Sequence, residues 1–237
     1  MIYLNLERIY AIDPIAFQSQ EPYPWINPEG LLTEERYRRL LNTLPDISLF
    51  ERRFEEKRKY GQQSHHRFAL EYRDDLDVAQ PWKEFVAELR GKDYQDFLHR
   101  LLRVRSFELS FHWHYTPNGC SVSPHCDAKW KLGSHIFYFN TAQDWDPIWG
   151  GETLLLDDGG RFKRESAPHF DDFARAIPSQ ALGNCSLLFA RKEHSWHGVR
   201  EIRCPEDRLR KVFIVVINRF TSADRLRRFF GSPAKGY

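Results

Sequence analysis

The sequence predicts an α+β, mainly β domain: a β-sandwich or jelly roll with N-terminal helices packed on one sheet. Apolar residues recur at helical spacing within the first hundred residues, and from residue 104 onward they recur at every second position. Helices followed by many short strands are typical of such a layered arrangement. An aromatic content of 15% adds large side chains that suit strands and a buried core.

The chain of 237 residues is long enough for one ordinary core. We expect a single compact domain made of three segments. Residues 1–103 should form an extended and helical segment packed on the barrel, residues 104–220 the β core, and residues 221–237 a terminal helix and tail.

Helices are expected mainly before the β core. Residues 1–30 contain several prolines and are expected to be irregular, lying over the domain. A helix should follow the candidate N-cap Thr33, and similar apolar spacing predicts helices over residues 82–89 and 94–101. Residues 50–78 are charged and unpatterned, so we expect them to form a loop that covers a substrate.

Strands dominate the second half. Residues 107–115 alternate strictly between large apolar and polar side chains, which predicts a long half-buried strand. The polar residues 161–182 are read as an insertion with a short helix at 170–176, and residues 222–230 as an amphipathic helix. The further strand candidates are residues 134–140, 152–157, 186–191, 197–202 and 211–218.

Two short motifs point to a metal site. His125 and Asp127 are separated by one residue, so on an extended strand both side chains lie on the same side. A distant histidine, His197, would complete a set of two imidazoles and one carboxylate. Such a set leaves coordination positions open, which favours non-haem Fe(II) oxygen chemistry over structural zinc. His194 is the alternative third ligand, although the Gly-Val that follows His197 favours His197.

Residues 107–218 resemble the catalytic domain of the Fe(II)/2-oxoglutarate-dependent oxygenases, and within that superfamily the prolyl 4-hydroxylase-like branch. The resemblance rests on six pieces that occur in the family's order. They are Tyr115 before the turn and the HxD motif, Phe137-Tyr138-Phe139-Asn140, Trp149-Gly150-Gly151-Glu152-Thr153, Ser186-Leu187-Leu188-Phe189, His197-Gly198-Val199, and the strand that opens at Arg210-Lys211.

The resemblance implies a double-stranded β-helix, the jelly-roll variant of this family, with Fe(II) held by His125, Asp127 and His197. It implies that 2-oxoglutarate and O2 are used in a hydroxylation that releases succinate and CO2, so that the protein would be a 2-oxoglutarate-dependent dioxygenase. The cosubstrate's far carboxylate would bind Arg210, with Lys211 as the alternative if the register shifts by one residue. Tyr115 would donate its hydroxyl to the cosubstrate, or alternatively be an ordinary aromatic side chain of its strand. No catalytic residue is expected beyond the metal ligands.

Two other classes are compatible with part of the sequence. A cupin-like barrel, acting as an isomerase or a sugar-binding module, would bind a metal without 2-oxoglutarate. A catalytically silent jelly roll would be a binding module and would not need an intact triad. The complete triad and the arginine at the last strand favour the oxygenase.

Composition narrows the classes of molecule that the protein is expected to bind. The net charge of +2 and the absence of long basic runs argue against nucleic acid, and no stretch is apolar enough to span a membrane. With no signal peptide apparent and four cysteines outside any CxxC pattern, we expect free thiols and a cytoplasmic protein. The substrate is expected to be a small molecule, a sugar or a peptide.

Overall fold

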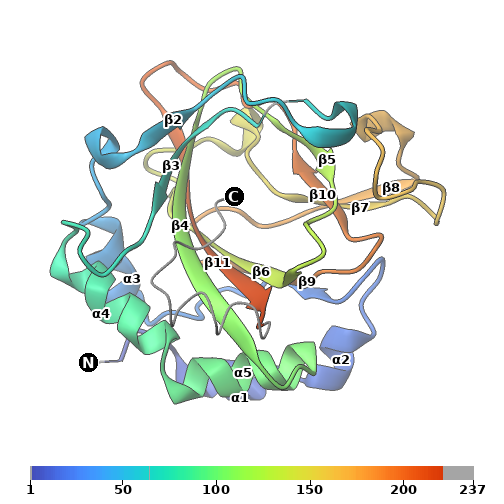
Figure 1. Cartoon of the computed structure of the whole chain (residues 1–237). Helices are drawn as coiled ribbons and strands as arrows, with labels where there is room; N and C mark the ends of the chain where they lie inside the picture. Colours follow the sequence, from blue (N-terminus) through green and yellow to red (C-terminus); the bar gives the residue numbers. More distant parts are fainter. Residues whose placement is uncertain (1, 64, 221–237) are drawn as a thin grey trace, which may run out of the picture.

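The computed structural model describes residues 2–63 and 65–220, so the helix expected at 222–230 lies outside the described residues. Two antiparallel sheets form the core (Figure 1). The seven-stranded sheet has the order β1-β9-β6-β11-β4-β3-β2, and the four-stranded sheet has the order β5-β10-β7-β8. The strands are β1 (Trp25–Ile26), β2 (Glu51–Arg53), β3 (Arg67–Glu71), β4 (Phe107–Pro117), β5 (Val122–His125), β6 (Lys131–Tyr138), β7 (Leu154–Asp157), β8 (Arg175–Pro178), β9 (Ser186–Ala190), β10 (Trp196–Val199) and β11 (Leu209–Arg219).

This arrangement confirms the predicted jelly roll with helices on one sheet. Side chains of the two sheets meet in the interior, where the Tyr138 hydroxyl donates to the Thr153 hydroxyl at 3.0 Å. Most neighbouring strands are not consecutive in the chain, and the longest pairing joins β4 to β11 along their whole length. The strand-rich half of the sequence therefore closes into a double-stranded β-helix.

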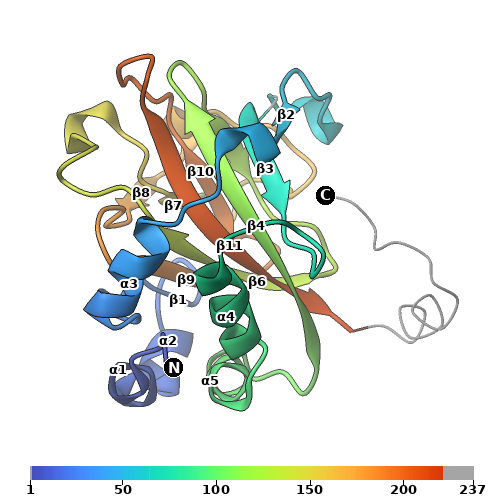
Figure 2. The ribbon, with the colours of Figure 1, turned by 90° about the vertical axis from the view of Figure 1, so that its left-hand side faces the viewer.

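Helices cover the outer face of the seven-stranded sheet (Figure 2). They are α1 (Leu6–Ala11), α2 (Pro14–Gln18), α3 (Glu34–Leu41), α4 (Gln80–Leu89) and α5 (Lys92–Leu102). The helices predicted after Thr33 and over 82–89 and 94–101 correspond to α3, α4 and α5.

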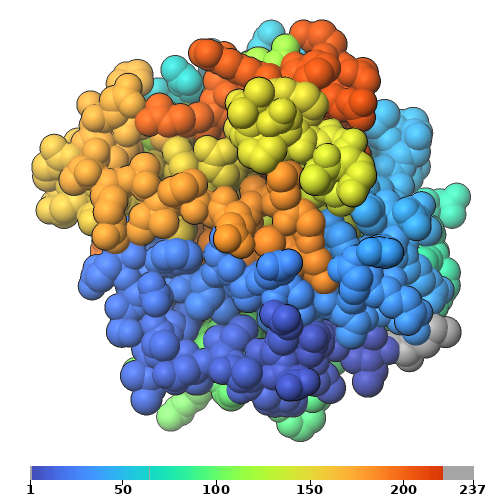
Figure 3. All heavy atoms as spheres, turned by 180° about the vertical axis from the view of Figure 1, so that it is seen from behind, coloured from blue at the N-terminus to red at the C-terminus, as the bar shows by residue number. Residues whose placement is uncertain are grey.

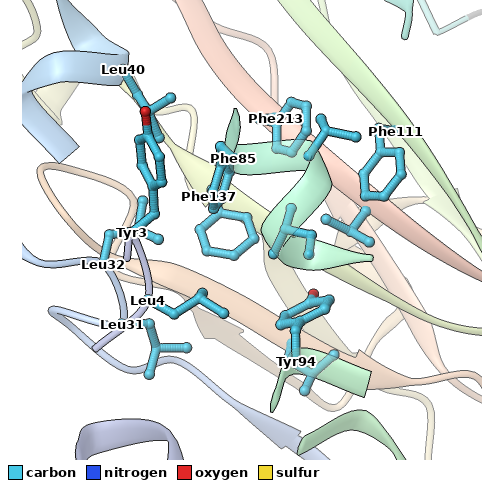
Figure 4. Close-up of a cluster of buried hydrophobic side chains, with 14 of the residues drawn as sticks. Tyr3, Leu4, Leu31, Leu32, Leu40, Phe85, Tyr94, Phe111, Phe137 and Phe213 are labelled. Carbon is cyan, nitrogen blue, oxygen red and sulfur yellow. The ribbon is translucent and has the colours of Figure 1, made fainter. Parts of the chain in front are cut away.

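The main core lies between these helices and the sheet (Figure 4). Phe213 of β11 is fully buried and meets Trp82 and Phe85 of α4 at ring-centroid distances of 5.1 and 5.7 Å. Phe137 and Phe111, from the strands on either side, face the same layer. Burying an aromatic side chain of this size contributes several kcal/mol, so this layer anchors the sheet that carries the site.

The expectation that residues 1–30 are irregular is wrong, because they contain α1 and α2. Asn5 and Asp13 cap the two helices by accepting hydrogen bonds from the backbone amides of Arg8 and Ile15. Each helix has fewer than two turns and buries a single apolar residue against the domain. Helices this short depend on tertiary packing, which leaves little periodicity to detect in the sequence.

Two other segments also differ from the prediction. Within residues 50–78, β2 and β3 extend the sheet, with Phe68 paired to Tyr115 of β4. Residues 170–176 form a single 3-10 turn, Phe170–Asp172, followed by β8, which pairs with β7. Pairing with an existing strand supplies the backbone hydrogen bonds that these polar stretches need. Local residue propensities do not predict such pairing.

Three strands of the seven-stranded sheet, β1, β2 and β3, come from the first 103 residues. That segment is therefore part of the sheet as well as its helical cover. Among the residues that the structure describes, no helix is long and apolar enough to cross a membrane.

Candidate functional site

His125, Asp127 and His197 converge inside the β-helix, with potential ligand atoms all within 4.8 Å of one another. His125 ends β5 and lies directly opposite His197 in the antiparallel pair of β5 and β10. Their ring centroids are 4.3 Å apart. The exposed fractions of the three residues are 8%, 5% and 7% in sequence order. The tertiary structure thus brings together the three residues predicted as metal ligands.

Gly198 is what allows these two strands to approach so closely. A Cβ at this position would lie 2.7 Å from the backbone oxygen of Val122 and 2.9 Å from the Phe170 ring. Both distances are below van der Waals contact, so any other residue would push β10 away from β5. The small residue after the distal histidine therefore has a structural reason in this chain.

The two imidazoles are oriented by backbone carbonyls. His125 Nδ1 lies 2.9 Å from the carbonyl oxygen of Ser123, and His197 Nδ1 lies 3.0 Å from that of Ser195. A carbonyl only accepts, so each Nδ1 carries the proton and each Nε2 keeps its lone pair for a metal. Such outer hydrogen bonds are the usual way in which proteins fix ligating histidines.

Electrostatics hold the three groups in metal-binding forms. Burial lowers the pKa of both His125 and His197, so these imidazoles are neutral near pH 7. Burial alone would raise the pKa of Asp127, but the Lys131 ammonium group, which donates to the carboxylate, holds that pKa below its ordinary value. Neutral imidazoles and an ionised carboxylate are the states that coordinate a divalent cation.

The Asp127 carboxylate is held from both sides. Lys131 Nζ lies 2.7 Å from Oδ1, and the Ser134 hydroxyl donates to Oδ2 at 3.1 Å. Both partners come from β6, which faces β5 across the interior. Because these contacts fix the carboxylate, the three ligands form a pre-organised group.

The structure distinguishes His194 from His197. His194 is exposed in the turn before β10, whereas His197 is buried on the strand beside Phe189, at a ring-centroid distance of 4.6 Å. Only His197 lies with His125 and Asp127.

Arg210 is the second residue of β11, and its side chain lies in the interior. It is 6% exposed, its Nε donates to the backbone oxygen of Gly151, and its Nη2 donates to the Thr153 hydroxyl at 3.2 Å. Burial lowers the pKa of Arg210, and among the described residues it forms no ion pair. The Glu152 carboxylate acts on Arg210 without pairing with it. A buried guanidinium that forms no ion pair is costly, which marks a place where an anion would be stabilised.

Strand register relates Arg210 to the metal ligands. His197 pairs with Leu155 of β7, and Thr153, which Arg210 contacts, lies two residues earlier, directly before β7. Sequence reasoning missed Tyr138, Thr153 and Ser179, whose hydroxyls form a linked group beside Arg210. The Phe-Tyr-Phe-Asn motif was the available signal for Tyr138.

Lys211 and Tyr115 lie on the other face of the sheet. They pair with each other across β11 and β4. Lys211 forms an ion pair with Asp144 at 3.0 Å, and the Tyr115 hydroxyl donates to the backbone oxygen of Pro45 at 3.2 Å. Tyr115 also stacks on Phe50, at a centroid distance of 4.3 Å. The structure therefore does not bring the predicted cosubstrate residue Tyr115 to the triad, and Arg210 is the inward-facing cation.

His65 is a neighbour of the triad that the sequence did not reveal. Its ring lies 4.7 Å from that of His125, and its Nε2 is 3.1 Å from the Ser123 hydroxyl. It comes from the charged segment between β2 and β3, where no periodic pattern marks it.

Arg210 also lines a cavity of about 530 Å³. Glu29, Trp145 and Gln180 also line it, so the N-terminal segment and two later loops form its walls. Figure 3 shows the face on which the N-terminal segment, in blue, lies against later segments in yellow and orange. Arg210 is thus buried and yet borders open space.

Comparisons with known proteins identify the fold. No family model matches the sequence, and no curated protein matches it either. Among solved structures, a prolyl 4-hydroxylase from Pseudomonas putida is similar, with a TM-score of 0.59 and 14% identity over 87% of this chain and 98% of that chain. A prolyl hydroxylase from Trichoplax adhaerens, in complex with a peptide fragment of the hypoxia inducible factor, has a TM-score of 0.61 and 12% identity over 96% and 94% of the two chains.

A third similar structure is SnoK, a non-haem α-ketoglutarate-dependent carbocyclase from nogalamycin biosynthesis. Its TM-score is 0.60, with 10% identity over 97% of this chain and 96% of that chain. The three comparisons cover 87%, 96% and 97% of this chain, so the likeness extends beyond the strands of the β core. The chain therefore has the prolyl 4-hydroxylase-like form of the double-stranded β-helix, the fold of the Fe(II)/2-oxoglutarate oxygenases.

Proposed function

We propose that the protein is an Fe(II)- and 2-oxoglutarate-dependent oxygenase that hydroxylates its substrate and converts 2-oxoglutarate to succinate and CO2. One observation carries the proposal: two neutral imidazoles and one ionised carboxylate converge within 4.8 Å in the interior of this fold. Two histidines and a carboxylate with open positions are typical of non-haem iron(II) oxygenases.

The ligand residues fit the metal. His125 and His197 would bind through Nε2, because their Nδ1 atoms are bonded to backbone carbonyls. Asp127 would bind through a carboxylate oxygen while Ser134 or Lys131 holds the other. Bound Fe(II), together with 2-oxoglutarate and O2, would supply the oxidising chemistry that replaces a C–H bond by C–OH.

Arg210 is proposed to bind the far carboxylate of 2-oxoglutarate. Its guanidinium is buried, its charge has no carboxylate partner among the described residues, and hydroxyls of Tyr138 and Thr153 lie beside it. The barrel wall between Arg210 and the ligands includes Leu155, which is fully buried. Such a dry surrounding strengthens a charge-assisted hydrogen bond.

Structural neighbours leave the substrate open to several chemical classes. The Trichoplax prolyl hydroxylase was solved with a peptide, whereas SnoK is a carbocyclase. A small molecule, a sugar or a peptide therefore all remain candidates for this chain, and hydroxylation is the reaction that we propose.

The proposal is tested by anaerobic titration of the metal-free protein with Fe(II) and then with 2-oxoglutarate. We expect one Fe(II) per chain and, on addition of 2-oxoglutarate, the visible absorption band of its iron chelate. On admission of O2, slow succinate release should follow even without substrate. The matched controls are Asp127→Ala, which should abolish the band, and His194→Ala, which should leave it unchanged. Metal binding with neither the band nor succinate release would favour the cupin-like alternative.

A further inference from the structure

Strand β5, which carries the ligand His125, lies at the edge of the four-stranded sheet. It has four residues and pairs only with β10 among the described strands, and the register of that pairing shifts between His197 and Val199. An edge strand directs half of its backbone hydrogen-bonding groups away from the sheet, so sheet pairing alone holds a short one weakly. The position of His125 therefore depends on contacts from outside this sheet.

The segment between β2 and β3 supplies such contacts to β5 (Figure 1). The Ser123 hydroxyl of β5 donates to the backbone oxygen of Gln63 at 3.3 Å, and His65 Nε2 lies 3.1 Å from the same hydroxyl. A hydroxyl has one proton, so His65 Nε2 is the donor of the second bond. The backbone oxygen of His65 accepts from Arg67 Nη1 at 2.8 Å, where β3 begins. His65 is thus fixed at β3 and at Ser123.

His65 also packs directly on the ligand. Four rings contact one another in series: the centroid of Phe189 is 4.6 Å from that of His197, which is 4.3 Å from that of His125. The fourth ring, His65, lies 4.7 Å from His125 at an interplanar angle of 58°, and His65 is 7% exposed. Close-packed neighbours restrict the torsions of a side chain, so His65 limits the rotation of the His125 imidazole.

We propose that His65 is a positioning residue of the metal centre, which orients His125 by packing on its ring and by holding Ser123. The Ser123 backbone oxygen accepts from His125 Nδ1 at 2.9 Å. The hydroxyl that His65 holds and the carbonyl that orients His125 belong to one residue, so fixing the first restricts the second. This inference rests on the metal site of the proposed function, and it concerns metal affinity.

The test measures the Fe(II) affinity of the metal-free full-length protein without oxygen, by competition with a chromophoric chelator. Outer partners of ligating histidines contribute about tenfold to a hundredfold in metal affinity, so His65→Ala should weaken Fe(II) binding by that factor. His65→Gln retains an N–H donor and part of the packed volume, and it should recover most of the loss. His66→Ala is the matched control, because the neighbouring imidazole stacks on Phe54 and should not affect the metal.

Ser123→Ala separates the hydrogen bond from other effects of His65, because it removes the hydroxyl and keeps the carbonyl that orients His125. It should weaken Fe(II) binding, and the double variant with His65→Ala should bind no more weakly than His65→Ala alone. Losses that multiply in the double variant would overturn the inference, because His65 would then act independently of Ser123. Ser123→Ala and His65→Gln also decide the matter if His65→Ala does not fold.

A role in folding alone would behave differently. It would lower the unfolding free energy of the metal-free protein and leave the Fe(II) affinity of the folded protein unchanged. The d–d absorption bands of the Co(II)-loaded protein depend on ligand geometry, so they should change in His65→Ala and return in His65→Gln. Unchanged Fe(II) affinity and Co(II) bands in His65→Ala, or a His65→Gln protein that binds as weakly as His65→Ala, would overturn the inference.

Failure of this inference is distinguishable from failure of the proposed function. If the wild type binds Fe(II) and forms the 2-oxoglutarate absorption band, and the His65 variants bind Fe(II) equally well, only the role of His65 is wrong. If the wild type itself does not bind Fe(II), the oxygenase proposal is wrong.

Discussion

Arg210 and Lys211 are adjacent in β11, yet their side chains lie on opposite faces of the seven-stranded sheet. Arg210 points into the β-helix and contacts Gly151 and Thr153, whereas Lys211 lies toward Asp144 in an ion pair at 3.0 Å. Side chains alternate along a strand, so a shift of one residue would exchange the two roles. The observed register assigns Arg210 to the interior.

Replacing Arg210 by glutamine should weaken 2-oxoglutarate binding about tenfold to a hundredfold, because one charge-assisted contact contributes about 1.5–3 kcal/mol. Fe(II) binding should change little. Anaerobic titration of the iron-loaded protein with 2-oxoglutarate measures the effect, with Lys211→Gln as the control for charge loss at the neighbouring position. A comparable loss in Lys211→Gln and none in Arg210→Gln would contradict the assignment.

His197→Ala should abolish tight Fe(II) binding, because one of three protein ligands is removed from a buried site. His194→Ala should bind iron like the wild type, since His194 is exposed in the preceding turn. Equilibrium dialysis with metal analysis compares the two variants. The reverse result, with iron lost only in His194→Ala, would mean that the ligand assignment is wrong.

Gly198→Ala should both destabilise the protein and weaken its metal site. The added Cβ would lie 2.7 Å from the Val122 oxygen, so β10 must move away from β5 and take His197 with it. Overpacking of this kind costs about 1–3 kcal/mol of unfolding free energy. Chemical denaturation of the metal-free protein and Fe(II) titration measure the two effects. Wild-type values in both measurements would show that the strands do not need this close approach.

The stability of the metal-free protein should fall as the pH is lowered through the range below 6.5, and His135 should contribute to the fall. His135 is fully buried against Tyr94, whose hydroxyl lies 2.8 Å from Nδ1, and burial lowers the pKa of His135 from 6.5 to about 3. Below pH 6.5 the unfolded chain binds a proton that the folded chain does not. Stability is therefore lost between pH 6.5 and about 3, by up to about 1.4 kcal/mol per pH unit for this residue.

Denaturant unfolding at a series of pH values tests this expectation. His135→Phe removes the titrating group, so its unfolding free energy should depend less steeply on pH than that of the wild type. Other buried histidines remain in both proteins, so the difference between the two slopes isolates His135. Identical slopes would show that His135 is not neutral in the folded protein.

The sequence alone was sufficient for much of the fold and of the metal centre. The change from helical spacing to alternation near residue 104 marks the boundary between the helical cover and the main strands, because buried helices and half-buried strands impose different periods on apolar residues. The HxD spacing places His125 and Asp127 on one side of an extended chain, and the residues after His197 distinguished it from His194. These signals are local or depend on motif order, so one sequence contains them.

Tertiary structure decided what depends on pairing between distant segments. Strand β3 forms because β4 offers it an edge, and β2 in turn pairs with β3. The short helices α1 and α2 form because the domain buries Ile9 and Phe17. Which of Arg210 and Lys211 faces inward depends on the register of β11 against β4 and β6, and that register also turns Tyr115 away from the triad. His65 lies beside His125 only because its segment, between β2 and β3, reaches the β5 end of the β-helix. Long-range packing fixes each of these positions, and no local pattern in the sequence predicts such packing.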